Sequence, residues 1–234
     1  MNGPQAALLE RARHRLAAMP DAVALVSFAA VFLFFALAAE NFLTPLSIAN
    51  ILTFASINGI AIVGVAILMI SGEFDLSVGS TFAVASYVFA LGLIAQVPPL
   101  LSLVAAVGVS ALLGLANGLI VTTTGIPSFI TTLGTMLAYR GIARAIGGSD
   151  FAFISGAPPK LFRILNAPLD SLNQLFSPAA TFRVSIFWFA AIAVLLAQVL
   201  RRTRYGNWVY ATGGNRGAAL SLGVPVRRVV VSNF

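Results

Sequence analysis

Two carboxylates, Glu73 and Asp75, lie two residues apart in the segment Ser71–Ser80, which separates two long apolar runs. Acidic side chains beside lipid are costly, and they usually face water or an internal partner. Two compatible hypotheses follow: the segment lines a polar path across a membrane, or Asp75 caps the helix that comes after it. Catalysis by an intramembrane pair of aspartates would instead require two carboxylates within the spans, whereas these lie in a predicted turn.

Several other kinds of chemistry are excluded by the residues that the sequence lacks. It has no cysteine and one histidine, His14, so we exclude thiol nucleophiles, iron–sulfur clusters and zinc sites made of these residues. The lone lysine, Lys160, follows two prolines, and no two glycines are separated by one residue, so a P-loop and a dinucleotide fingerprint are both missing. We therefore predict no enzymatic activity, no metal and no cofactor.

The composition predicts a protein that lies in lipid. Of the 234 residues, 59% are hydrophobic and 9% are charged, against about 25% charged residues in an average soluble domain. So few charges cannot cover the surface of a soluble domain, and nucleic-acid binding is excluded with it. The net charge of +7 then carries information about orientation, because basic residues gather in cytoplasmic loops. We predict an all-α, polytopic helical membrane protein.

Six spans are predicted from the lengths of the apolar runs and from the helix breakers between them. A span needs about 20 apolar residues, because about 30 Å of hydrocarbon is crossed at about 1.5 Å per residue. Pro98-Pro99 and Gly125-Ile126-Pro127 divide the uncharged run between Leu76 and Tyr139. The predicted spans are residues 22–39, 48–70, 76–95, 100–121, 128–146 and 184–200.

Basic residues predict the orientation of these spans. Arg11, Arg13 and Arg15 precede the first span, and Arg201, Arg202 and Arg204 follow the sixth. We expect residues 1–21 to be a cytoplasmic tail, 22–228 a transmembrane domain, 147–183 an external loop with amphipathic helices, and 201–228 a cytoplasmic loop. A cleaved signal peptide is the alternative for the first run, which is longer than the roughly 7 to 15 apolar residues of a signal. Residues 229–234 begin a further span that is not completed, so we expect a fragment.

Two patterns within the spans predict either helix packing or a polar path. Small residues recur every four positions on one face of the fourth span, which favours close approach of another helix in lipid; they are Ala106, Ser110, Gly114 and Gly118. Asn117 lies beside this row, and we interpret it as a helix-packing residue in preference to a path residue. Asn58 lies inside the second span, where path lining is preferred, because an amide in lipid needs a partner.

Two breaks in the helical pattern are further candidate sites. Gly125 and Pro127 interrupt residues 122–135, which indicates either irregular backbone lining a cavity or a tight cytoplasmic turn. In the cytoplasmic loop, Asn215 precedes Ala218-Ala219-Leu220 and Gly223 follows them, which predicts a short capped helix. Such a helix either docks a partner or is an ordinary surface helix.

Taken together, these motifs resemble the ribose/xylose-type permeases of bacterial ABC importers, which are related to branched-chain amino-acid permeases. The resemblance covers about residues 48–228. It is carried by Asn58–Ser80, Asn117–Val121, Pro127–Met136, Arg140-Gly141, Tyr210–Asn215 and Ala218–Gly223, in the family's order and spacing. One departure is Glu73, where many members have glycine. The family also continues for several helices beyond residue 234.

The resemblance implies a fold like that of the vitamin B12 importer class and a role in sugar import across a bacterial inner membrane. The implied partners are an ATP-binding subunit, a periplasmic sugar-binding protein and a second permease copy, with a homodimer expected. The implied substrate path contains Asn58, Asp75, Ser77, Asn117, Phe129 and Thr132. The implied ATPase-coupling residues are Gly213, Gly214, Asn215, Ala218, Ala219 and Gly223.

Two alternatives stay open. A branched-chain amino-acid ABC permease would share most of these motifs. A self-sufficient secondary transporter or channel would need its own coupling-ion site, usually carboxylates at mid-membrane, and the predicted spans contain none away from their ends.

Overall fold

The computed structural model describes residues 20–148, 159–177 and 180–234. The predicted tail, including Arg11, Arg13, His14 and Arg15, lies outside the described residues except for its last two positions. Within the described ranges every regular element is a helix, so the predicted all-α class is confirmed. The helices are α2 (Pro20–Ala38), α3 (Pro45–Ile70), α4 (Val78–Ile94), α5 (Pro99–Thr124), α6 (Ser128–Gly147), α7 (Lys160–Asn166), α8 (Asp170–Phe176), α9 (Ser185–Arg202), α10 (Arg204–Gly214), α11 (Arg216–Ser221) and α12 (Val226–Asn233).

Prolines and glycines set the helix boundaries. Helix α3 begins at Pro45, three residues before the predicted start, because the Thr44 hydroxyl caps it by accepting from the Ser47 N–H at 3.3 Å. Helix α5 begins at Pro99 and ends at Thr124, and its C-cap residue Gly125 adopts φ +72°. Glycine has no Cβ and adopts this left-handed conformation freely, so the helix stops there.

Among the described residues, α3, α5 and α9 are long enough and apolar enough to cross a membrane. The apolar helices Ala22–Ala38 and Val78–Ile94 are shorter. Helix α6 has 20 residues and carries Arg140 and, in its last turn, Arg144. These helices fit a multi-pass membrane protein, and the total of six spans stays a prediction.

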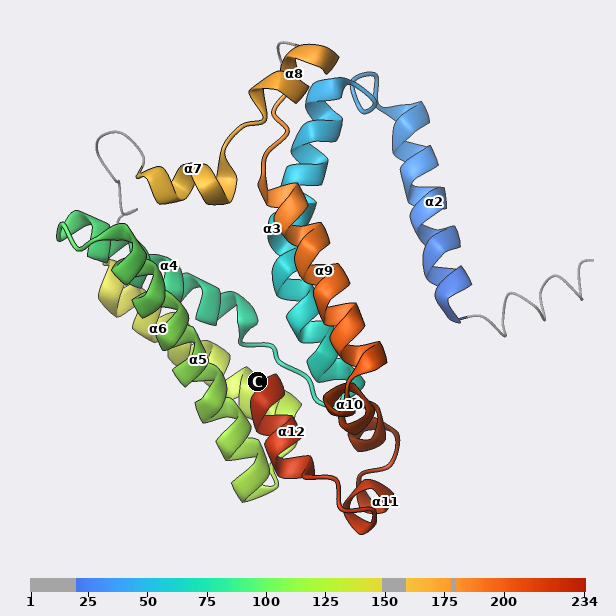
Figure 1. Ribbon diagram of the computed structural model, residues 1–234, viewed down its shortest axis with the longest axis vertical. Coiled ribbons are helices and arrows are strands. Elements are labelled where there is room, and N and C mark those ends of the chain that lie inside the picture. The colour runs from blue at the N-terminus through green and yellow to red at the C-terminus, as the bar shows by residue number, and fades with distance from the viewer. Residues whose placement is uncertain (1–19, 149–158, 178–179) are drawn as a thin grey trace, which may run out of the picture.

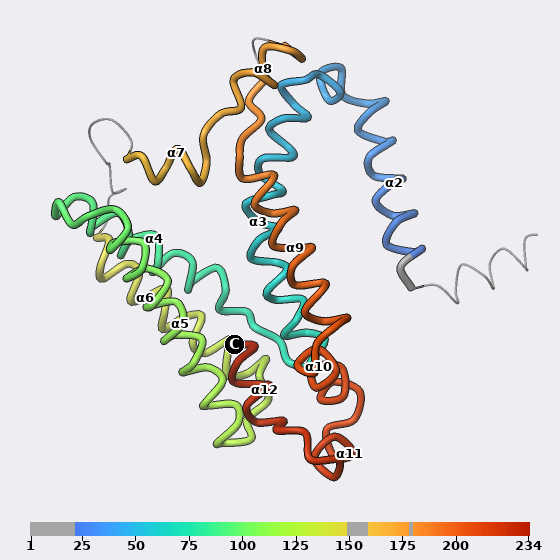
Figure 2. Tube along the Cα trace, in the orientation of Figure 1, coloured from blue at the N-terminus to red at the C-terminus, as the bar shows by residue number. Residues whose placement is uncertain are grey.

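The helices form two groups, which Figures 1 and 2 show diverging from one end of the molecule. In one group α3 packs along α9, and in the other α4 packs along both α5 and α6. Helices α10 and α12 each contact α3, and α12 also packs on α5, so this end joins the groups. Helix α8 lies at the opposite end of α3 and α9 from α10 and α11 (Figure 1).

Buried apolar side chains are few and lie between packed helices. Val84, Tyr139 and Ala143 form one cluster where α4 meets α6. A second cluster, where α5, α11 and α12 meet, consists of Val121, Ala219, Val226 and Val230. Most other large apolar side chains are exposed, as expected when lipid is the solvent.

The two glycines in the row of small residues on α5 lie against α12 and the residue that follows it. A Cβ on Gly118 would lie 2.9 Å from the Val231 Cα, and Gly114 lies against the Phe234 backbone. Ala106 is buried, and the Ser110 hydroxyl bonds to the Ala106 carbonyl of its own helix at 3.0 Å. Helix α12 therefore approaches α5 at the positions that lack side chains.

This contact predicts a position-specific effect of enlarging glycines on α5. Gly118→Leu should displace α12 and lower the free energy of unfolding by about 1–3 kcal/mol, the usual cost of overpacking. Gly108→Leu is the matched control, because nothing lies within 4 Å of a Cβ there. Thermal unfolding of both variants in the same detergent is the measurement; equal stabilities would contradict the packing.

Candidate functional site

A non-helical connector, residues 71–77, joins α3 to α4 and is the centre of the candidate site. In Figure 2 the trace leaves the end of α3 beside α10 and runs to the start of α4. Gly72, at φ +88°, ends α3. Its N–H donates to the Met69 carbonyl at 2.9 Å, and the Glu73 N–H donates to the Leu68 carbonyl at 3.2 Å. This pattern of two bonds is the Schellman termination, in which glycine is preferred.

The first turns of α6 hold the middle of the connector. The Phe74 N–H donates to the Ser128 hydroxyl at 3.0 Å, and the Leu76 N–H donates to the Thr132 hydroxyl at 3.1 Å. Backbone outside a helix has lost its helical partners, so each N–H needs another acceptor in an apolar setting. The hydroxyl residues after Pro127 supply these acceptors.

Asp75 organises the turn before α4 and does not cap that helix. Its Oδ1 accepts from both the N–H and the hydroxyl of Ser77, each at 2.6 Å. Helix α4 begins at Val78, with Ser77 as the N-cap residue and no side-chain cap bond. The capping hypothesis for Asp75 is therefore wrong, because Asp75 lies two residues before the N-cap position and closes a local Asx turn instead.

Asn117 connects this turn to two further helices. Its Nδ2 donates to the Ser77 hydroxyl at 2.8 Å, and its Oδ1 lies 3.0 Å from the Tyr139 hydroxyl, which is also 2.9 Å from the Leu113 carbonyl. Asn117, Ser77 and Thr132 are each 0% exposed. We refer to Asp75, Ser77, Asn117, Ser128, Thr132 and Tyr139 as the polar cluster; it links the connector, which leads into α4, to α5 and α6.

Four of the six predicted path residues belong to this cluster: Asp75, Ser77, Asn117 and Thr132. The other two lie elsewhere: Asn58 is exposed on α3 and bonds to the Phe54 carbonyl of its own helix at 2.9 Å, and Phe129 is 53% exposed on α6. Because the innermost cluster residues are fully buried, a solute can reach them only when the helices separate. In this conformation the cluster joins helices.

Sequence reasoning missed Ser128 and Tyr139 as members of the cluster. A signal for Tyr139 was present, since it lies seven residues after Thr132 and therefore on the same face of α6. The signal for Ser128 was its position directly after the predicted helix breaker at Pro127. A hydroxyl there can accept from a connector N–H that has no helical partner.

The predicted coupling segment is a short capped helix, α11. The Asn215 side chain accepts from the Ala218 N–H at 2.9 Å, and Gly223, at φ +80°, follows the helix, as the sequence predicts. Ala219 is 1% exposed and packs on α5 and α12, whereas Ala218 is exposed. One face of α11 is thus anchored, and the other is free to meet a partner.

The two glycines before α11 have opposite surroundings. A Cβ on Gly213 would lie 1.9 Å from the Ile70 carbonyl oxygen, so α10 approaches the end of α3 as closely as two backbones can. A Cβ on Gly214 would meet nothing within 4 Å. Gly213 is therefore required for packing, and Gly214 leaves space on the surface.

An ion pair joins α11 directly to the connector. The Arg216 guanidinium donates to Glu73 Oε1. The Glu73 side chain is 6% exposed and that of Arg216 is 51% exposed. The two residues are 143 positions apart, and no local pattern in the sequence signals their contact.

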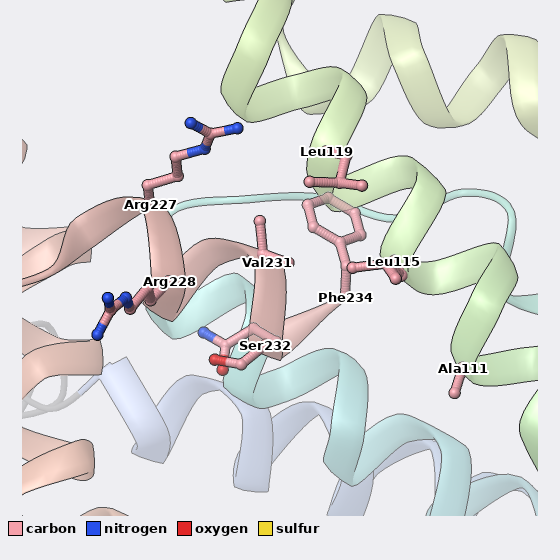
Figure 3. A pocket seen from close by; sticks show the side chains of 9 residues that line it. Ala111, Leu115, Leu119, Arg227, Arg228, Val231, Ser232 and Phe234 are labelled. Carbon is pink, nitrogen blue, oxygen red and sulfur yellow. The ribbon is translucent and has the colours of Figure 1, made fainter.

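An open groove lies away from the polar cluster. It has a volume of about 890 Å³ and runs between α5 and α12 (Figure 3). Leu115, Leu119 and Phe234 form its apolar side, and Arg227 and Arg228 extend from α12. No member of the polar cluster lines it.

The polar cluster predicts that Asn117 and Asn58, which lie on the apolar helices α5 and α3, differ in their effect on stability. Asn117→Leu should lower the free energy of unfolding by about 1–3 kcal/mol, because the buried Ser77 hydroxyl loses a partner. Asn58→Leu, the matched control on α3, should change it little. Denaturation of both purified variants checks this, and an unchanged stability for Asn117→Leu would contradict the cluster's role.

These features define a class: a multi-pass helical membrane protein with a polar connector between apolar helices and a short exposed helix at one end. Residues 47–234 match the family described as "Branched-chain amino acid transport system / permease component". The chain belongs to this family of ABC-importer permeases, as its motifs predict.

Curated relatives include several sugar permeases. The chain is 34% identical to the galactose/methyl galactoside import permease protein MglC of Escherichia coli over 200 residues, 80% of this chain and 57% of that protein. It is 33% identical to the ribose import permease protein RbsC of Bacillus subtilis over 82% of this chain and 56% of that protein. It is 32% identical to the xylose/arabinose import permease protein XylH of Sulfolobus acidocaldarius, over 86% and 54%. The chain thus spans a little over half of these relatives' length. No solved structure gives a significant match.

Proposed function

We propose that this chain is the membrane-spanning subunit of an ATP-driven importer that moves a sugar of the pentose or hexose class. Its sugar-permease relatives support the substrate class. The observation that carries the mechanism is α11, a capped helix with one face packed on α5 and α12 and its other face exposed. We propose that an ATP-binding subunit grips this exposed face at Gly214, Asn215, Ala218 and Gly223. The other two coupling residues, Gly213 and Ala219, fix the segment to the membrane helices.

In this proposal the sugar arrives on a periplasmic binding protein at the opposite face of the membrane. The N-terminus and α11 are then cytoplasmic, the segment 147–183 is external, and a second permease copy completes the channel. Six spans and a fold like that of the vitamin B12 importer class belong to the same proposal. Because the binding protein holds the sugar tightly, the path needs only weak contacts. We propose Asn58, Phe129 and the polar cluster as these contacts; the cluster, which joins the connector to α5 and α6, becomes accessible to the sugar when these helices move apart.

A branched-chain amino acid is the second candidate substrate, because the matching family is described by that transport system. The carboxylates of the connector give less support to the alternative of a secondary transporter. Glu73 is paired with Arg216 and is therefore not available as a coupling-ion ligand in this conformation, and the Oδ1 of Asp75 is occupied by Ser77.

The two glycines predict a test of coupling. Gly214→Trp should abolish ATP-dependent uptake while leaving the membrane level intact, because the indole has room in the permease but occupies the face offered to the ATP-binding subunit. Gly64→Trp is the matched control, since a Cβ there also meets nothing within 4 Å and the position lies on α3 far from α11.

The measurement is uptake of radiolabelled ribose, xylose, galactose and leucine by cells carrying each variant. We expect a sugar to be taken up by the wild type and by Gly64→Trp. Unimpaired uptake in Gly214→Trp would contradict the coupling assignment. Uptake of leucine and of none of the sugars would transfer the assignment to the amino-acid class.

A further inference from the structure

The two helix groups meet at the end where α10, α11 and α12 lie. Helices α3 and α9 form one group, and α4, α5 and α6 form the other. The connector passes from the first group to the second beside α10 (Figure 2). A force applied to α11 can therefore change the arrangement of the groups only through the contacts made at this end.

Two contacts attach α10 and α11 to the connector region. The first is steric: Gly213 packs against the Ile70 carbonyl, so the end of α10 is fixed against the end of α3. The second is the ion pair between Arg216, the first residue of α11, and Glu73 in the connector. It is the only ion pair among the residues that the structure describes. The steric contact resists only a movement of α10 towards α3, whereas the ion pair also resists a movement of α11 away from the connector.

The burial of Glu73 makes the ion pair a stiff link. A carboxylate that is 6% exposed cannot exchange Arg216 for water without being left as an unpaired buried charge, which is strongly unfavourable. When α11 moves, the lowest-energy response is therefore for Glu73 to follow. The next residues of the connector then move too, since they are its covalent neighbours.

The other end of the connector passes that movement to α5 and α6. Phe74 and Leu76 bond through their N–H groups to Ser128 and Thr132 of α6, and Ser77 bonds to Asn117 of α5. A continuous chain of contacts thus runs from the exposed face of α11 to the helices of the second group. Every step in it is an ion pair, a hydrogen bond or a covalent segment of seven residues at most.

We propose that the Glu73–Arg216 pair is the link that transmits the movement of α11 to the polar cluster, and that it stays closed throughout the transport cycle. The inference rests on the proposed function, since it presupposes that an ATP-binding subunit moves α11. Glu73 and Arg216 are positioning residues in this account, acting through the connector and making no contact with the sugar.

The test removes the link without leaving a buried charge. Glu73 is the buried member of the pair, and an apolar residue of similar size in its place leaves no buried charge, so Glu73→Met/Arg216→Met should fold. The variants are reconstituted in proteoliposomes with the ATP-binding subunit and the sugar-loaded binding protein, using radiolabelled ribose and galactose. Sugar imported and ATP hydrolysed are measured together. Arg227→Met, which removes an exposed arginine outside this ion pair, is the control for the loss of an arginine side chain.

We expect the double variant to hydrolyse ATP while importing less sugar per ATP, by about fivefold or more, the lower range of an allosteric coupling. Arg227→Met should keep the wild-type ratio. An unchanged ratio in the double variant would overturn the inference and leave the proposed function standing. A wild type that imports neither sugar in an ATP-dependent way would overturn the proposed function, and the inference with it.

A second variant tests whether the Glu73–Arg216 pair stays closed, without relying on the amount of sugar imported per ATP. Residues 1–234 contain no cysteine, so Glu73→Cys/Arg216→Cys introduces the only thiols in this part of the protein, and a bifunctional thiol reagent that matches the span can bridge them. We expect import to be restored by bridging, relative to the unbridged double cysteine variant. Loss of import on bridging would show that the pair must open, and would overturn the inference.

Discussion

The structure depends on satisfying the backbone of the connector between two apolar helices. Seven residues there leave the helical pattern, and in an apolar setting their N–H groups must find acceptors within the protein. Gly72 and Glu73 use carbonyls at the end of α3, and Phe74 and Leu76 use hydroxyls of α6. This requirement brings α6 against the connector and places Ser77 beside Asn117 of α5. The packing of the second helix group follows from it.

The same connector gives the exposed helix α11 a mechanical relation to the membrane helices. Gly213 lets α10 lie directly on the end of α3, and Arg216 reaches Glu73 from the first position of α11. The absence of side chains at Gly114 and Gly118 lets α12 lie on α5. The short helix α11, which is exposed on one face, is thereby joined to both helix groups. In such an arrangement a movement of α11 can change the spacing between the groups.

Local patterns predicted the helices and their boundaries well, because apolar runs, prolines and glycines act through nearby residues. The cap at Asn215 and the turn at Gly223 are of this kind. The polar cluster was predicted in part: Asp75, Ser77, Asn117 and Thr132 come together, but Asn58 and Phe129 lie apart from them. The capping role of Asp75 was wrong, because the N-cap residue is Ser77, two positions further along the chain. The Glu73–Arg216 pair could not be predicted, because a contact across 143 positions depends on how α10 and α11 fold back onto α3.

The measurement that tests the account most directly is purification of this permease from its native membranes in mild detergent, with peptide identification of the chains that accompany it. The account predicts an ATP-binding subunit held at α11 and, under gentle conditions, a sugar-binding protein whose ligand names the substrate. Recovery of the permease without any ATP-binding subunit, together with import that persists when ATP is depleted and an ion gradient is maintained, would contradict ATP-driven import.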